Sequence, residues 1–182
     1  MPSPDEQRTA NAPELTFGAN GPDLSHLSIL VVGSNMETRG IICSMLMNLK
    51  VTRIREASTV SAAYAMLQEY PPDLIITDYE TRPTNGVDFV RWVRNGSDSP
   101  YPKVPVILVS GRTDANSVRM ARDSGIDEFV ALPFSFNILF ERIHAVTGGQ
   151  RTFVQSRNFV GPDRRRRERP IQGKGRRKKD DE

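Results

Sequence analysis

Two kinds of segment alternate along the chain from residue 28 to residue 149. Short runs rich in Val, Ile and Leu are typical of strands covered on both faces, and each is followed by apolar residues at helical spacings of three and four. The five apolar runs cover residues 28–32, 51–57, 73–78, 104–110 and 127–132, and the five helical patterns cover residues 36–49, 59–70, 86–96, 114–125 and 134–149. The pattern predicts an α/β fold with a (βα)₅ doubly wound parallel sheet.

Prolines and glycines mark the ends of the predicted helices. Pro71 and Pro72 follow the second helical pattern, and Gly96, Gly125 and Gly148 end the third, fourth and fifth. These residues stop helices because proline cannot continue one and glycine accepts the backbone angles of a C-terminal cap. In such a sheet the functional groups gather where the strands end.

The turns after the strands therefore form the candidate site. They are residues 33–35 after the first strand, Asp78 at the end of the third, residues 110–111 after the fourth and residues 132–134 after the fifth. The first of these turns, Gly-Ser-Asn, has no carboxylate or other ionisable group. Asp78 is thus the one carboxylate that these turns supply.

Three segments carry a family resemblance, each in the order and spacing of that family. They are "PDLIITD", with Gly86 eight residues beyond its final aspartate, "PVILVSG", and "GIDEFVALPFS". Over residues 26–147 the chain resembles the CheY-like receiver domain of bacterial two-component response regulators. The resemblance implies a flavodoxin-like parallel sheet in the order 2-1-3-4-5 and a role in phosphorelay signal transduction.

The resemblance also assigns roles to single residues. It makes Asp78 the phosphoacceptor, Ser110 the residue that binds a phosphoryl oxygen, and Phe129 the aromatic switch. A phosphoryl group beside a carboxylate crowds negative charge, which the family neutralises with Mg²⁺ and a lysine.

The charged partners that this chemistry needs are missing. The acidic pair that holds Mg²⁺ in the family aligns with Gly33 and Ser34, and the lysine aligns with Leu132. We expect a vestigial pocket with no metal ion and no catalytic residue. Two alternatives stay open: Glu80 reaches toward a cation, or Asp78 only accepts hydrogen bonds from turn amides.

Both ends of the chain differ from this domain in composition. Residues 1–25 are rich in Pro, Asn, Asp and Gly, so we expect a disordered arm and no signal peptide. The single cysteine, Cys43, excludes an internal disulfide and fits the cytoplasm, and no run is long enough to span a membrane. Residues 148–182 are expected to form a flexible basic tail.

The charge is concentrated in this tail. Residues 151–182 hold twelve of the 25 Lys and Arg but five of the 22 Asp and Glu, so they carry about +7 and residues 1–150 about −4. Every positive residue from 151 to 170 is arginine, whose planar fork suits phosphate oxygens and the guanine edge. Phe153 and Phe159 are candidates to stack on a base. The predicted ligand-binding residues are Arg151, Arg157, Asp163, Arg164, Arg165, Arg166 and Arg167.

The arginine block resembles a segment of alphaproteobacterial CheY-like proteins that bind cyclic di-GMP and act on motility and surface attachment. The sequence thus predicts a non-enzymatic signalling adaptor that binds cyclic di-GMP through its tail. Its protein partner would dock on the face made by residues 114–125, 127–132 and 134–149. The alternatives are a conventional response regulator phosphorylated on Asp78 by a histidine kinase, and a nucleic-acid binder that uses its tail.

Overall fold

The computed structural model describes residues 24–148, 153–156 and 159–163. Five strands and five helices alternate along the chain, followed by two further strands. The elements are β1 Ser28–Val32, α1 Met36–Asn48, β2 Arg53–Ala57, α2 Val60–Glu69, β3 Leu74–Asp78, α3 Gly86–Asn95, β4 Val106–Ser110, α4 Ala115–Asp123, β5 Glu128–Ala131, α5 Phe136–Thr147, β6 Phe153–Ser156 and β7 Phe159–Pro162. The sequence-based order of elements is confirmed.

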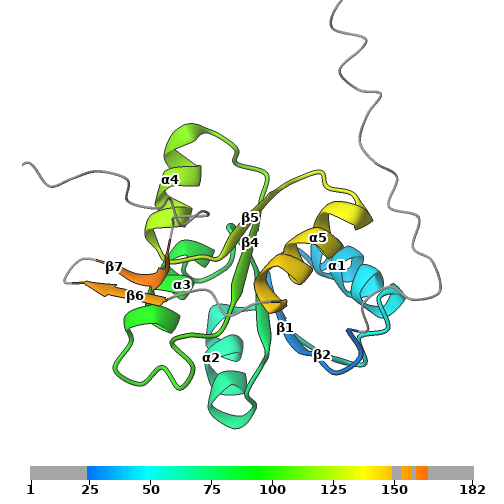
Figure 1. The fold of residues 1–182 in the computed structure, drawn as a ribbon, viewed down its shortest axis with the longest axis horizontal. Coiled ribbons are helices and arrows are strands. Elements are labelled where there is room, and N and C mark those ends of the chain that lie inside the picture. The colour runs from blue at the N-terminus through cyan, green and yellow to red at the C-terminus, as the bar shows by residue number, and fades with distance from the viewer. Residues whose placement is uncertain (1–23, 149–152, 157–158, 164–182) are drawn as a thin grey trace, which may run out of the picture.

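The central sheet is parallel and has the strand order β2-β1-β3-β4-β5 (Figure 1). The order predicted from the sequence is therefore correct. Parallel strands are stable when both faces are covered, and β4 is buried at every position. All five strands run the same way, so their carboxyl ends share one edge and their amino ends share the other.

The helices cover the two faces of the sheet unequally. Buried residues of α1 and α5 share one apolar cluster with alternate residues of the strands, and buried residues of α2, α3 and α4 share the other. Each helix begins at a side-chain cap that accepts a hydrogen bond from a backbone amide of its first turn. These caps are Asn35, Thr59, Asn85, Asp114 and Ser135.

The folded domain begins earlier than the sequence indicated. Leu24 is 3% exposed and belongs to the apolar cluster beneath α1 and α5, and its carbonyl accepts a hydrogen bond from the amide of Leu27. The predicted disordered arm, residues 1–25, is wrong at its last two residues. The rest of the arm lies outside the described residues, and within the described part no helix is long and apolar enough to cross a membrane.

The predicted flexible tail, residues 148–182, contains a hairpin. β6 and β7 pair antiparallel, with Phe153 opposite Pro162 and Ser156 opposite Phe159. Gly161 and Pro162 are buried, and β7 contacts α3 (Figure 1). The prediction is therefore wrong for these two strands, because they pair with each other and pack on the domain.

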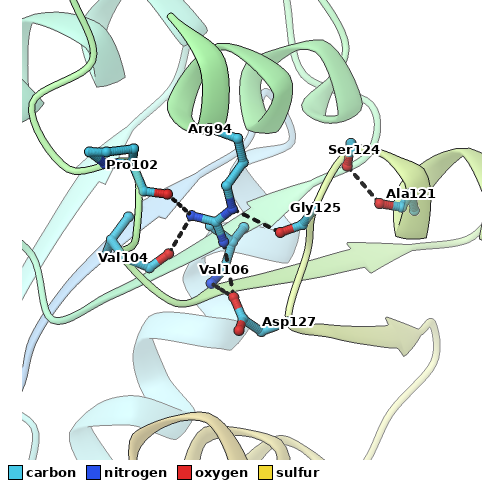
Figure 2. Close-up of polar contacts among 8 residues, drawn as sticks. All are labelled: Arg94, Pro102, Val104, Val106, Ala121, Ser124, Gly125 and Asp127. Carbon is cyan, nitrogen blue, oxygen red and sulfur yellow. Dashed lines mark hydrogen bonds and ion pairs between the residues drawn. The ribbon is translucent and has the colours of Figure 1, made fainter. Parts of the chain in front are cut away.

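The amino edge of the sheet is organised by one buried cation, Arg94, at the end of α3 (Figure 2). Its Nε donates to the carbonyl of Gly125 at 2.9 Å, and its Nη1 donates to the carbonyls of Pro102 at 2.9 Å and Val104 at 2.7 Å. Its Nη2 pairs with Asp127 Oδ2 at 3.0 Å. The Arg94 side chain is fully buried, so these partners replace its water.

Asp127 makes this burial possible. One of its oxygens accepts both the Arg94 guanidinium and the amide of Val106, the first residue of β4. Burial lowers the pKa of Arg94 to about 10, and the charge of Asp127 opposes that shift. Arg94 therefore stays charged at neutral pH, with its counter-charge beside it.

Replacing Asp127 by alanine should lower the free energy of unfolding by about 3 to 5 kcal/mol, because it leaves a guanidinium buried without a counter-charge. Urea unfolding at neutral pH measures this change. The matched control is Asp88→Ala, which removes an exposed partner of Arg91 and should cost at most about 1 kcal/mol. Equal losses in the two variants would contradict the account.

Candidate functional site

The carboxyl edge of the sheet brings together the residues that the sequence singled out. Gly33 and Ser34 follow β1, Asp78 ends β3, Ser110 ends β4 and Leu132 follows β5. Asp78 lies beside Val109 in the paired strands, and the amide of Leu132 donates to the carbonyl of Ser110 at 2.8 Å. These residues therefore line one edge of the sheet, as expected for a receiver pocket.

Asp78 is held by its own turn. Its Oδ1 accepts the amide of Glu80 at 3.0 Å, and the backbone of Tyr79 also bonds to the carboxylate. Partial burial raises the pKa of Asp78, the charge of Glu80 raises it further, and the two backbone hydrogen bonds lower it. The Asp78 carboxylate therefore accepts hydrogen bonds from the amides of its own turn, as one of the two alternatives from the sequence describes.

A guanidinium that the sequence analysis missed lies at the position of the acidic pair. Arg39 Nη1 donates to the carbonyl of Gly33 at 2.6 Å, and Arg39 Nε lies 3.4 Å from a carboxylate oxygen of Glu56. A Cβ on Gly33 would lie 3.3 Å from the Cβ of Asp78 and 3.4 Å from the Cγ of Arg39. Arg39 therefore packs against the same turn that faces Asp78.

The residues of this edge do not fit Mg²⁺. The ion prefers several hard oxygen ligands, among them one or two carboxylates, in octahedral geometry. Here Asp78 is the one carboxylate in the turns after the strands, and Ser34 adds a neutral hydroxyl whose oxygen has no hydrogen-bond partner. The carbonyl of Gly33 already accepts a hydrogen bond from Arg39. A dication would therefore meet one carboxylate in these turns, while a second acid, Glu56, is already paired with Arg39.

Ser110, the second polar residue of the pocket, also forms a hydrogen bond with the turn that follows it. Ser110 is fully buried, and its Oγ accepts the amide of Arg112 at 2.9 Å. Phe129, the predicted switch, is half-buried and packs against the apolar cluster beneath α2, α3 and α4. Leu132, at the lysine position, packs against the opposite cluster, beneath α1 and α5, and brings no charge to the pocket.

The Glu80 carboxylate, which the sequence suggested as a ligand for a metal cation, forms an ion pair with Arg112. Its carboxylate pairs with Arg112 Nε at 3.0 Å, and the Arg112 guanidinium lies 5.6 Å from the centre of the Tyr79 ring. These side chains line an open hollow of about 420 Å³ beside the turn, together with Thr81, Arg82 and Asn85. The Glu80 carboxylate therefore points toward the Arg112 guanidinium.

Of the predicted ligand-binding residues, the structure describes Asp163. This residue directly follows β7 and is half-buried. The arginines predicted to bind the ligand, Arg151, Arg157, Arg164, Arg165, Arg166 and Arg167, lie outside the described residues. Arg94 and Gly125, which lie close to the hairpin, were not assigned to any site from the sequence.

Asp78→Asn should stabilise the protein at neutral pH. A carboxyl whose pKa is raised by folding costs stability while it is ionised, and that cost disappears as the pH falls through its folded pKa toward the unfolded value. Urea unfolding should show a gain at pH 7 that shrinks as the pH approaches about 4. Glu141→Gln, which removes an exposed carboxyl of α5, is the control variant. A loss of stability in Asp78→Asn at pH 7 would refute the assignment.

Known proteins with similar sequences share this domain. The chemotaxis protein CheY of Pseudomonas aeruginosa is 28% identical over 120 residues, which cover 66% of this chain and 95% of that protein. The transcriptional regulatory protein KdpE of Mycobacterium tuberculosis is 31% identical over 107 residues, which cover 58% of this chain and 45% of KdpE. The similarity to KdpE thus spans less than half of that protein.

Solved structures show the same fold. The chemotaxis protein CheY4 of Vibrio cholerae aligns with a TM-score of 0.60 at 22% identity, covering 66% of this chain and 98% of CheY4. The receiver domain of the sensor histidine kinase PA1611 of Pseudomonas aeruginosa aligns with a TM-score of 0.61 at 20% identity, covering 68% of this chain and 98% of that domain. Residues 29–144 match the family model of the response regulator receiver domain, and the chain therefore belongs to the response regulator receiver family.

Proposed function

We propose that this receiver domain acts as a signalling adaptor that works with little or no phosphorylation and binds cyclic di-GMP through its arginine-rich tail. The observation that carries the first part is the Arg39 guanidinium on the carbonyl of Gly33, where the family resemblance places a metal-binding acid. A glycine stands where the family has an acid, and the guanidinium that bonds its carbonyl is paired with Glu56. The protein is a signalling module and not an enzyme in this proposal, and it acts in the cytoplasm.

The charge at the pocket explains why phosphorylation is disfavoured. Transfer of a phosphoryl group to Asp78 adds negative charge to a carboxylate whose pKa is already raised by burial and by Glu80. Catalysis of such a transfer depends on cations placed where this charge develops. With Leu132 in the lysine position, the pocket supplies neither the metal nor the lysine.

The composition of the tail supports the choice of ligand. Four consecutive arginines, residues 164–167, follow Asp163, and further arginines stand at positions 151, 157 and 169. Guanidinium forks bind phosphates and the O6/N7 edge of guanine bidentately, and a carboxylate accepts hydrogen bonds from the donors on the opposite edge of guanine. A dinucleotide with two guanines and two phosphates uses all of these groups.

We infer that a protein partner docks on the face formed by α4, β5 and α5. Two of these elements are joined by an ion pair, in which Arg142 Nη1 of α5 donates to a carboxylate oxygen of Glu128 in β5 at 3.2 Å. α4 presents exposed polar residues beside them, Asn116 and Arg119. The ion pair therefore joins β5 to α5, and α4 adds polar groups that face solvent.

The second candidate is a conventional response regulator phosphorylated on Asp78 by a histidine kinase. It is favoured by one specific observation, since Asp78 and Ser110 occupy the strand ends at which the family resemblance places the acceptor and the phosphoryl-binding hydroxyl. A tail that binds nucleic acid through its charge is the remaining alternative.

Incubation with acetyl phosphate and Mg²⁺ should leave the intact mass of the protein unchanged. The triple variant Gly33→Asp, Ser34→Asp, Leu132→Lys restores the acidic pair and the lysine, and should gain one phosphoryl group that disappears when Asp78→Asn is added. A stoichiometric gain by the parent protein, lost in Asp78→Asn, would favour the conventional regulator.

Replacing Arg164 and Arg165 by lysine keeps the charge but removes the bidentate geometry, so binding of cyclic di-GMP should weaken by about 1 to 3 kcal/mol per lost contact. Isothermal titration measures the affinity. Arg176→Lys with Arg177→Lys, in the lysine-rich end, is the matched control and should bind like the parent protein. Parent-like affinity in the first variant would exclude the arginine block as a nucleotide clamp. Equal binding of single-stranded RNA, weakening steeply with salt, would favour the nucleic-acid binder.

A further inference from the structure

β2 is the outermost strand at one margin of the central sheet, and in the described part of the chain it pairs with β1 alone (Figure 1). The carbonyl of Ala57 points toward β1, because it accepts the amide of Gly33 at 3.0 Å. Backbone groups alternate in direction along a strand, so the N–H and C=O of Ile54 and Glu56 point away from β1. These outward groups define the free margin of β2, to which another extended chain can bond.

Two arginines of β2 give one face of this margin a positive charge. Arg53 and Arg55 lie on the same face of the sheet as Ala57, because they are two and four residues from it. Ala57 belongs to the apolar cluster beneath α2, α3 and α4. Both arginines are exposed, and so is Lys50 in the segment before β2. The margin therefore carries a basic row on the face that α2 covers.

Neighbouring residues hold both guanidinium groups. The guanidinium carbon of Arg55 lies 3.4 Å from the centre of the Tyr70 ring, directly after α2, and Arg53 donates to the carbonyl of His26. A guanidinium stacked on a ring keeps its N–H fork available, and this fork binds carboxylates bidentately. In the described part of the chain no carboxylate forms an ion pair with either arginine. The two arginines can thus take carboxylates from a partner.

The opposite face of the margin is apolar at one position and electrically balanced at the other. Ile54 is half-buried and packs against the apolar cluster beneath α1 and α5. The Glu56 carboxylate lies 3.4 Å from Arg39 Nε, so its charge already has a partner. A strand beside β2 places alternate side chains on the two faces of the sheet. The margin therefore suits a strand in which acidic and apolar residues alternate.

The charges of the margin disfavour a second copy of β2 as the added strand. Two β2 strands paired about a two-fold axis would bring the basic rows of both copies together on one face, and like charges on paired strands are destabilising. Charged side chains on edge strands commonly prevent such self-pairing. The same charges favour a strand of opposite charge, because specificity is a difference between the affinities for competing partners.

We propose that the free margin of β2 binds an extended acidic segment of a partner protein, which adds to the sheet as a further strand. Backbone hydrogen bonds to Ile54 and Glu56 supply affinity, and acidic side chains at alternate positions pair with Arg53 and Arg55. β2 and β5 are the outermost strands at opposite margins of the sheet, so this surface is separate from the face formed by α4, β5 and α5. The inference is independent of the ligand proposed for the tail.

An acetylated peptide of four Val-Glu repeats is the probe. Titrated into the isotopically labelled full chain, it should protect the amides of Ile54 and Glu56 from hydrogen exchange, whereas the amide of Arg55 faces β1 and should be protected with or without peptide. A peptide of four Val-Lys repeats should not bind. The Val-Glu peptide N-methylated at its backbone amides should not bind either, because it cannot donate hydrogen bonds to the margin. Equal binding of either control peptide would overturn the inference.

Reversing the charge of the basic row tests the side chains. Arg53→Glu with Arg55→Glu should weaken the Val-Glu peptide about tenfold or more and allow the Val-Lys peptide to bind. Arg91→Glu with Arg119→Glu is the matched control, since it changes the net charge equally at exposed arginines of α3 and α4, and should bind the Val-Glu peptide like the parent protein. In both variants protected amides of β3 show that the domain is folded. Parent-like affinity in the first variant, or a parent protein that does not bind the Val-Glu peptide, would overturn the inference.

Discussion

The Arg94 guanidinium connects four parts of this molecule that are distant in sequence. Arg94 lies in the last turn of α3, and its guanidinium donates hydrogen bonds to carbonyls of the segment before β4 and of the turn between α4 and β5. It also lies under the ring of Phe153 in β6. A buried charge is stable only when each of its donors is satisfied, so these parts must keep their positions for Arg94 to stay inside. Asp127 supplies the negative counter-charge of Arg94, and it also accepts a hydrogen bond from the amide of Val106, the first residue of β4.

The two edges of the sheet have opposite properties. At the carboxyl edge Asp78 and Ser110 are satisfied by their own turns, and Arg39 bonds the carbonyl of Gly33. At the amino edge, the buried Arg94 and the backbone of Gly125 lie against the β6–β7 hairpin.

Much of the fold was predictable because its signals are local and repeated. Strands buried on both faces show as unbroken apolar runs, and helices show their spacing and their end residues. The burial of Leu24 was missed because a single apolar residue in a polar segment shows no helical or strand periodicity. The hairpin was missed because Gly161 and Pro162, which are buried in it, carry little apolar signal in the sequence.

The site was predictable in its positions but not in its charges. Alignment with the family motifs located Asp78, Ser110 and Leu132 at the strand ends, where the structure has them. Arg39 and Arg94 are arginines within helices, and in sequence such residues are indistinguishable from solvated surface charges. Their roles depend on carbonyls that other segments bring to them, which local patterns do not encode.

The central claim is the proposal that cyclic di-GMP binds to the arginine-rich tail and not to the receiver pocket. Amide chemical-shift mapping of the isotopically labelled full chain during titration with cyclic di-GMP tests it most directly. The account predicts shifts in the arginine block and in Asp163, with Gly33, Asp78 and Ser110 unchanged. Shifts confined to the turns that hold Gly33, Asp78 and Ser110 would contradict it.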